Sequence, residues 1–333
     1  MAGEGFSVPI APGWTRNVAS HTLRSAEITT DVSRMAYRFR MDEPIEQGVR
    51  RIAREQIDEA LAAIGSADLP LERIIHEVRR RCKALRALIR LVRPVFADFK
   101  TENVAFREMA RALAGARDSK VLVETLDDLA EADGDAAAQR LMGRLRKRFA
   151  RPSEKAEALH RTLAQSVAQL EAAKVRIAGW TLDARGWDSL SDGFRKTVKS
   201  ARGAMASLAR SDDAECSHEW RKHVKYHWHH MRLLRVAGPE AADARIRLAE
   251  RLAGLLGERH DLDLFVETIA AQPRQGADAA ALDLLVAKAR KRAARLEAKA
   301  GQIGARLFEE KPRKLAGKWG ERWRGHAKVA AIA

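Results

Sequence analysis

Cysteine is almost absent from this chain of 333 residues, where only Cys82 and Cys216 occur. Two cysteines cannot build a disulfide framework, and no Cys-x-x-Cys pair indicates zinc or redox chemistry. Long apolar runs are also missing, so no stretch reaches the roughly 18 apolar residues of a membrane span. The first residues lack the charged start and the apolar stretch of a secretion signal. We therefore expect a cytoplasmic protein that does not contact a membrane.

Acidic residues are too few to balance the basic ones. The chain has 45 Asp and Glu against 61 Lys and Arg, which is a formal net charge of +16. A protein this basic usually binds polyanions, a class that includes nucleic acids, anionic membranes and polyphosphorylated ligands. Net charge alone does not choose among these partners.

Strand patterns are scarce as well. Between about residues 43 and 308, Ala, Leu, Arg, Glu and Lys dominate, and apolar residues recur at intervals of three and four. This pattern predicts an all-α protein whose helices are separated by turns that contain Gly or Pro. Residues 1–40 are poor in the pattern, so we treat them as an N-terminal arm of unknown structure. We interpret residues 311–333 as a basic C-terminal tail that either contacts an anion or is a mobile, solubilising end.

The helical region repeats itself. Four pairs of segments match, in the same order in both halves: GVRRIAR at 48 with GFRKTVK at 193, HEVRRRCK at 76 with HEWRKHVK at 218, LAGARD at 113 with LLGERHD at 255, and VLVETL at 121 with LFVETI at 264. One match between Arg-rich helices could arise by chance, but four in the same order indicate a duplication. We therefore predict two homologous helical bundle units, at residues 41–180 and 181–310.

The second pair of segments carries a basic helix face, because positions three, four and seven apart share one side of a helix. This side holds His76, Arg79, Arg80, Lys83, Arg86 and Arg90 in the first unit, and His218, Arg221, Lys222, Lys225, His229 and Arg232 in the second. Like charges four residues apart repel, so an ordinary solvated face interleaves Glu with Lys. These two faces mostly do not, which favours the binding of an extended anion.

The preceding helix of each unit adds further basic residues. They are Arg50, Arg51 and Arg54 in the first unit, and Arg195, Lys196, Lys199 and Arg202 in the second. If neighbouring helices lie side by side, these residues converge with the two basic faces. Arg117 and Arg259 each follow a glycine two residues earlier, near a helix end, and could close the resulting groove.

The histidines raise the alternative of a metal site. His223 and His227 are four residues apart, a spacing that can chelate zinc or nickel on one helix turn. No Asp or Glu completes a ligand set nearby, and the surrounding Arg and Lys would repel a dication. We expect no physiological metal site, although adventitious binding of nickel is compatible with this spacing.

An enzyme is a second alternative. The only repeated acids near the basic motifs are Asp118 and Asp261, whose simplest role is to pair with Arg117 and Arg259 and hold a turn. No P-loop, no Gly-x-Gly-x-x-Gly after a strand and no Gly-x-Ser-x-Gly motif occurs. We therefore expect a protein without catalytic activity and without a cofactor.

Nucleic-acid binding is the third alternative, because a basic groove suits any phosphate backbone. Base recognition would also require Asn or Gln beside the Arg residues, and single-strand binding would require exposed aromatic rings. The basic faces contain almost no Asn or Gln, and the nearby rings of Trp220, Tyr226 and Trp228 occur in only one unit. A ligand with charge but without bases fits these faces better.

The repeated motifs resemble a known family. HEVRRRCKALR and HEWRKHVKYHW, each preceded by a basic helix and followed by LAGARD or LLGERHD, resemble the two halves of a CHAD domain, the conserved histidine α-helical domain. The resemblance implies two four-helix bundles related by pseudo-twofold symmetry, with a basic groove or pore between them. It also implies non-catalytic binding of inorganic polyphosphate and association with polyphosphate granules. No obligate protein partner is evident.

The resemblance also implies a ligand set, carried over by motif position. It consists of His76, Arg79, Lys83 and Arg86 in the first unit, His218, Arg221, Lys222 and Lys225 in the second, and Lys196, Lys199 and Arg202 from the preceding helix. Arg117 and Arg259 match the motif that closes each unit. Two departures stand out: Trp228 occupies the position of Arg86, and His260 is inserted before Asp261.

Overall fold

The computed structural model describes residues 37–114, 118–130, 136–149, 156–211, 214–273 and 277–330. Within these ranges the regular structure is entirely helical and contains no strand. The prediction of an all-α protein is confirmed. No helix in the same ranges combines the length and the apolar composition needed to cross a bilayer. Of the predicted N-terminal arm, residues 1–36 lie outside the described part of the chain.

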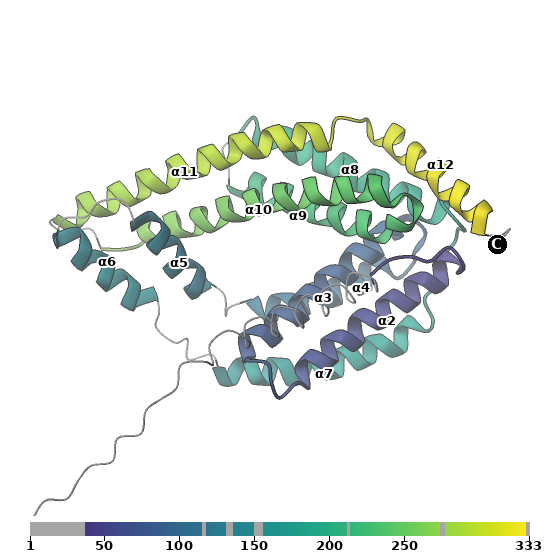
Figure 1. Ribbon diagram of the computed structural model, residues 1–333. Coiled ribbons are helices and arrows are strands. Elements are labelled where there is room, and N and C mark those ends of the chain that lie inside the picture. The colour runs from purple at the N-terminus through teal and green to yellow at the C-terminus, as the bar shows by residue number, and fades with distance from the viewer. Residues whose placement is uncertain are drawn as a thin grey trace, which may run out of the picture. The chain divides into compact units, whose positions relative to one another are not determined.

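Four helices of the first half pack side by side: α2 (Ile45–Ile64), α3 (Leu71–Leu91), α4 (Phe99–Ala112) and α7 (Ala156–Ile177) (Figure 1). In α3 the buried positions recur at three- and four-residue steps, which is the amphipathic pattern of its sequence. The helix ends just before Arg93-Pro94, because proline disfavours helical dihedrals in the residue before it. Nε of Arg176 in α7 donates to Oε1 of the buried Glu102 in α4 at 2.7 Å, which joins these two helices.

The second half contains α8 (Asp188–Leu208), α9 (Ala214–Leu233), α10 (Pro239–Ala270) and α11 (Ala277–Leu307). α9 packs against both α8 and α10, and α10 packs against α11. α10 starts at Pro239, a favourable first residue because its missing N–H would have no partner inside the helix. Two short 3-10 helices, η1 (Arg93–Val95) and η3 (Arg235–Ala237), lie in the turns after α3 and α9. α10 has 32 residues and α9 only 20, so α10 and α11 extend beyond α9.

Two helices from the first half cover this extension. α5 (Asp118–Ala130) and α6 (Ala136–Phe149) pack against α10 and α11, although they precede α7 in the chain (Figure 1). One apolar cluster joins all four helices, with Leu126, Leu145, Phe265, Ile269 and Leu282 among its buried members. The predicted first unit therefore contributes two helices to the core of the predicted second unit, and the boundary between 180 and 181 stays a prediction.

The segment predicted as a basic tail contains a packed helix, α12 (Pro312–Ala330). Leu315, Trp319 and Trp323 are buried on the side that contacts α8. The rings of Trp187 and Trp323 lie 6.3 Å apart between centroids. The cations from Lys311 to Arg324 are exposed while the apolar residues anchor the helix, so the mobile-end interpretation does not hold for residues 312–327.

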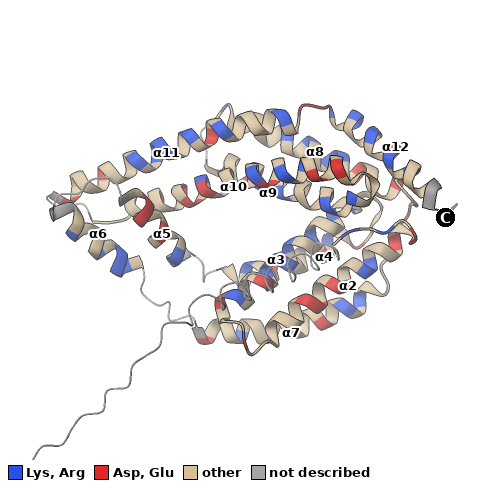
Figure 2. Cartoon of the chain, in the orientation of Figure 1, with Lys and Arg blue, Asp and Glu red and all other residues tan. Residues whose placement is uncertain are grey.

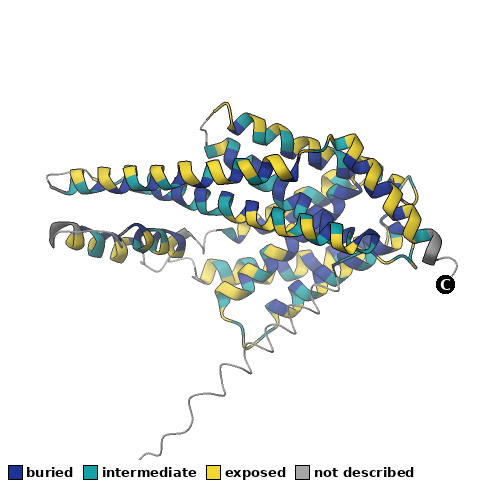
Figure 3. Cartoon of the chain, turned by 45° about the horizontal axis from the view of Figure 1, so that its top comes forward, coloured by how far each residue is buried: buried dark blue, intermediate teal, exposed yellow. Residues whose placement is uncertain are grey.

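α8 and α9 both rest on the C-terminal half of α3. At Gly193 of α8, an added Cβ would lie 1.9 Å from the carbonyl oxygen of Leu91, so only glycine permits this approach. Nε2 of the buried His230 in α9 bonds to the carbonyl oxygen of Ala87 at 2.9 Å. Figure 3 shows that buried and exposed positions lie on different sides of the helices. The packing places the C-terminal half of α3 beside α9.

Candidate anion-binding surface

The contact between α3 and α9 brings the two predicted basic faces together. His229 of α9 is buried and lies among cations from both helices. Burial has the largest effect in lowering its pKa, and Arg232, Lys225 and Lys83 lower it further. The guanidinium of Arg90 in α3 lies 4.5 Å from the ring centroid of Tyr226 in α9. Figure 2 shows Lys and Arg recurring along α3. We name as the α3–α9 surface the residues His76, Arg79, Lys83, Arg86 and Arg90 with His218, Arg221, Lys225 and Arg232.

On α3, neutral groups orient the guanidinium groups. Arg86 and Arg90 share one acceptor, Oδ1 of Asn103 in α4, at 3.3 and 3.2 Å. Nη1 of Arg79 donates to the carbonyl oxygen of Ala110 at 2.9 Å. Burial lowers the pKa of Arg86, and Arg90 and Arg107 lower it further, against a raising effect of Tyr226. An amide orients Arg86 and Arg90 without cancelling their charge, so this end of the surface keeps a positive potential.

On α9, two cations lie close to the ring of Trp228. Nζ of Lys225 and Cζ of Arg232 each lie 4.7 Å from its ring centroid, which is within the range of a cation–π interaction. Burial lowers the pKa of Lys225; Arg221 and Arg232 lower it too, while Glu250 raises it. The sequence showed Trp228 only as a departure from Arg86. The structure shows that it supports the two cations.

The two motif histidines, His76 and His218, lie at the exposed end of each basic face. His76 lines a cavity of about 310 Å³ together with Arg79, Lys120 of α5 and Asp261 of α10. The ring of His218 lies 5.2 Å from that of His260, the inserted residue of the second repeat. Partial burial lowers the pKa of both; Lys83 and Arg73 add to this at His76, and His260 and Arg221 add to it at His218. Both rings are therefore mainly neutral near pH 7 and can take up a proton when an anion arrives.

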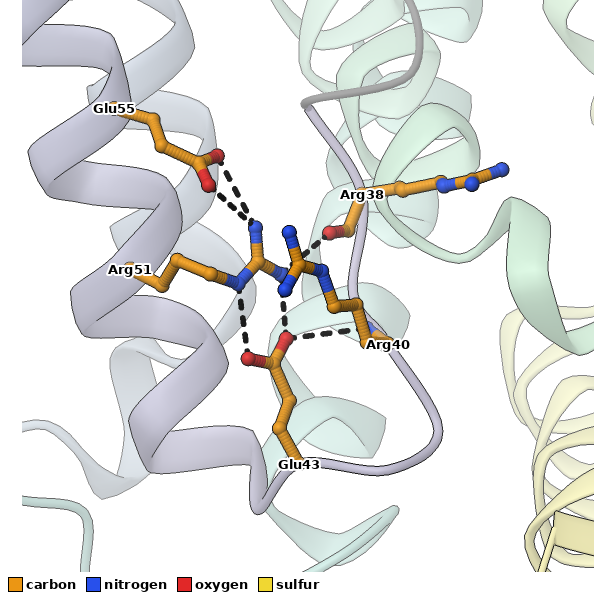
Figure 4. A network of polar contacts seen from close by, with 5 residues as sticks. All are labelled: Arg38, Arg40, Glu43, Arg51 and Glu55. Atoms are coloured by element: carbon orange, nitrogen blue, oxygen red, sulfur yellow. Dashed lines mark hydrogen bonds and ion pairs between the residues drawn. The ribbon is translucent and has the colours of Figure 1, made fainter.

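Several residues of the predicted site are engaged elsewhere. Arg51 is held by Glu43 and Glu55 and by the carbonyl oxygen of Arg38, at distances of 2.5 to 3.1 Å (Figure 4). These carboxylates raise the pKa of Arg51 against the effect of burial. Arg54 is exposed on α2 and lies near Lys174 of α7 rather than on the α3 face. The helix before the first basic face therefore uses Arg51 to hold the chain at its own start.

Two predicted site residues of the second unit also bond to groups away from the α3–α9 surface. Arg202 donates to the carbonyl oxygens of Phe308, Glu309 and Glu310, where α11 ends. Arg259 is only 4% exposed and pairs with Glu297 at 3.3 Å and Asp263 at 3.9 Å, so it belongs to the interior of α10 and α11.

Lys196 and Lys199 are exposed on α8, whereas Gly193 and Val198 are buried. The assignment of Lys196 and Lys199 to the site stays a prediction.

Three other predicted site residues are Arg80, Lys222 and Arg117. Arg80 pairs with Glu77 at 2.5 Å, and Lys222 pairs with Glu219, each within one turn of its own helix. Arg117 lies outside the described residues. Asn103 and Lys120 were not predicted, because no motif marks them. Helices α4 and α5 bring them beside the residues of α3.

The histidine pair considered for a metal does not converge with other ligands. Among the described residues, no three His, Cys, Asp or Glu side chains are placed to bind one ion. His227 is fully buried, and Nε of Arg245 donates to its Nε2 at 3.3 Å. Burial lowers the pKa of His223 to about 4, with Lys222 adding to the effect.

The family model of the CHAD domain matches residues 51–270, about two thirds of the chain. The chain belongs to the CHAD domain family. The family is linked to polyphosphate. A solved structure titled PptA from Streptomyces chartreusis is similar, with a TM-score of 0.55 and 16% identity over 80% of this chain and 100% of that chain. At this identity the likeness shows the fold alone, and the curated proteins contain no match.

The match to the CHAD domain covers both basic faces. It includes all of α3 and α9 and ends at the last residue of α10, so α11 and α12 lie beyond it. The residues of the α3–α9 surface therefore belong to the CHAD part of the chain.

Proposed function

We propose that this CHAD protein binds inorganic polyphosphate along the α3–α9 surface and does not cleave it. The observation that carries the proposal is the crowding of cations on this surface: besides burial, which is the main cause, Arg221 and Arg232 lower the pKa of Lys225, and Arg90 lowers the pKa of Arg86. Such a cluster is costly without an anion. A chain with about one charge per phosphate relieves the repulsion and accepts charge-assisted hydrogen bonds from each Arg and Lys.

The proposal includes an architecture and a place in the cell. Two homologous four-helix bundles related by pseudo-twofold symmetry would contribute α3 and α9, one each, to a basic groove. The protein would act in the cytoplasm, on polyphosphate granules. The repeated sequence motifs and the membership of a family linked to polyphosphate support this proposal.

The alternative ligand is a nucleic acid, and the aromatic rings argue against it. Trp228 is covered by Lys225 and Arg232, and Tyr226 by Arg90, so both rings already serve as supports for cations. Stacking of unpaired bases needs free ring faces. Backbone binding without stacking would still be possible, so the experiment compares the two ligands directly.

The test is a titration with long-chain polyphosphate and with single-stranded DNA of matched charge at physiological salt, combined with an assay for released phosphate. We expect tighter binding of polyphosphate and no release. The variant Arg79→Ala/Arg221→Ala should bind much more weakly, and Arg313→Ala/Lys314→Ala, which removes two exposed cations of α12, should bind as the unchanged protein does. Because Arg79 also bonds to Ala110, Lys83→Ala/Lys225→Ala provides a second site variant. Equal affinity for DNA would favour the nucleic-acid alternative, and released phosphate would show an enzyme.

A further inference from the structure

A second row of cations lies on α11, beyond the part of the chain that matches the CHAD domain. Arg295, Lys299 and Arg306 are four and seven residues apart, so they share one side of the helix. All three are exposed. Figure 2 shows Lys and Arg recurring along this helix. From Arg295 to Arg306 the row extends over roughly 17 Å of helix axis.

Two contacts determine which side of α10 lies beside this row. Arg292, three residues before Arg295, pairs with Glu258 of α10, and Nη2 of Arg245 in α10 donates to the carbonyl oxygen of Leu307 at 2.5 Å. These contacts align the two helices in opposite directions. Arg247 and Arg251 precede Glu258 by eleven and seven residues, so they share its side of α10, and both are exposed. We name Arg247, Arg251, Arg295, Lys299 and Arg306 the α10–α11 seam.

Two of the carboxylates near the seam have other partners. Glu258 bonds to Arg292, and Glu297 of α11 pairs with the buried Arg259. Glu250 of α10 acts on Lys225 of α9, where it raises the pKa of the amine. Among the described residues, none of the five seam cations forms an ion pair or a hydrogen bond. Glu250 and Glu309, which are exposed and lie three residues after Arg247 and Arg306, offset part of the repulsion among these cations, and a bound anion would offset the rest.

The route from the α3–α9 surface to the seam crosses α10 at glycines. α10 packs against α9 on one side and α11 on the other. Gly257 meets the guanidinium of Arg221, and a Cβ at Gly254 would meet no atom within 4 Å. Gly254 is four residues before Glu258 and three after Arg251, so it lies on the side of α10 that carries the seam. A phosphate chain that leaves Arg221 meets a bare stretch of backbone and then the cations of the seam.

We propose that the α10–α11 seam binds a second stretch of the same polyphosphate chain, so that long chains are held at two places. This inference rests on the proposed function of the α3–α9 surface. Polyphosphate fits the seam better than single-stranded nucleic acid, because Phe265, the only Phe, Tyr or Trp in α10 or α11, is buried and leaves no ring for a base. A chain long enough to reach both places makes its second contact within one complex, which raises its affinity but not that of a short chain.

The test compares two variants of the full chain that lose equal charge. The seam variant is Arg247→Gln/Arg251→Gln/Arg295→Gln/Lys299→Gln. The control variant is Lys311→Gln/Arg313→Gln/Lys314→Gln/Arg324→Gln, which neutralises four exposed cations in and beside α12. Each is titrated with tripolyphosphate, with long-chain polyphosphate and with single-stranded DNA, and thermal melting checks that both are folded.

We expect the seam variant to lose roughly tenfold or more in affinity for the long chain while its affinity for tripolyphosphate is unchanged. The control variant should change neither affinity substantially. The proposal is overturned if the seam variant binds long chains as tightly as the unchanged protein, or if the control loses as much, since that would show general attraction by net charge. Loss of DNA binding with polyphosphate binding intact would instead make the seam a nucleic-acid interface.

The same experiment separates this inference from the proposed function. If Arg79→Ala/Arg221→Ala weakens binding of both polyphosphates and the seam variant weakens neither, only the second contact is wrong. If the unchanged protein does not prefer polyphosphate to DNA, the proposed function fails and the inference fails with it.

Discussion

The guanidinium of Arg221 lies against the backbone of α10 at Gly257. A Cβ added at Gly257 would be 3.3 Å from Nε and 3.4 Å from Nη2 of Arg221. This glycine belongs to the repeated LLGERHD motif, in which the sequence suggested roles for Arg259 and Asp261 but none for the glycine. The structure assigns it a purpose: it makes room for a cation of the α3–α9 surface.

Replacement of Gly257 by Ala should therefore weaken polyphosphate binding while it stabilises the fold. Ala is favoured over Gly inside a helix by about 1 kcal/mol, so the melting temperature should not fall. The methyl group would displace the Arg221 guanidinium by a few tenths of an ångström, and titration should show an affinity loss that is smaller than that of Arg221→Ala. Gly254→Ala is the matched control, because it makes the same change three residues away where a Cβ meets nothing within 4 Å. Equal affinity of both variants would show that the position of Arg221 is unimportant.

Binding of polyphosphate should strengthen as pH falls from 8 to 6. In the free protein the pKa of His76 and of His218 is below the ordinary value of 6.5, so both rings are mainly neutral. A bound polyanion favours the protonated form and raises these pKa values, so binding takes up protons and gains affinity at lower pH. Each unit of pKa increase can contribute up to about 1.4 kcal/mol, or tenfold, at the acid end.

The variant His76→Gln/His218→Gln is the control for that pH dependence. Titrations at pH 6 and pH 8 should then give affinities that differ much less than those of the unchanged protein. If the unchanged protein itself binds equally at both values, the two histidines do not carry charge in the complex.

The buried His230 should make the fold sensitive to acid. Burial lowers its pKa to about 3, far below the ordinary value of 6.5, and the bond to Ala87 only partly opposes this. The unfolded chain therefore takes up the proton first as pH falls, so the free energy of unfolding decreases from about pH 6.5 towards about pH 3. The total effect is on the order of a few kcal/mol.

Urea unfolding at several pH values between 7.5 and 4 measures this sensitivity. His230→Gln, which keeps a group able to donate to Ala87, should reduce the pH dependence of the free energy of unfolding. His326→Gln removes an exposed histidine of α12 and should leave the dependence unchanged. If the His230 variant retains the full pH dependence, that dependence arises from His227 and His229, because burial lowers their pKa values as well.

Arg51 should matter for stability and not for the ligand. Arg51→Ala leaves the carboxylates of Glu43 and Glu55 without their shared partner (Figure 4), and we expect a loss of about 2 kcal/mol in the free energy of unfolding. Arg54→Ala, on the exposed side of the same helix, should change it by less than about 0.5 kcal/mol. A variant at Arg51 that keeps its stability but loses affinity for polyphosphate would support the original assignment of Arg51 to the site.

The two basic faces were predictable because helix periodicity is local. His76 to Arg90 and His218 to Arg232 share their faces whatever surrounds them, and the repeat in the sequence identified them as equivalent. The same local rule made Arg51, Arg202 and Arg259 look equally suitable. Some of their partners are local, since Glu55 and Asp263 lie four residues after Arg51 and Arg259. Others are distant in the sequence, such as the carbonyl oxygens after α11 for Arg202 and Glu297 for Arg259, and no local pattern reveals these.

Periodicity and composition alone thus establish an all-α chain with two matching basic helices and an excess of positive charge. They do not establish which cations remain available, because that depends on what packs behind each helix. Gly193 against Leu91 brings α8 and α9 onto α3, and α5 and α6 cross to α10 and α11, far from their neighbours in the sequence. Contacts between distant segments are selected by the burial of whole helix faces, so the α3–α9 surface is determined only when the helices assemble.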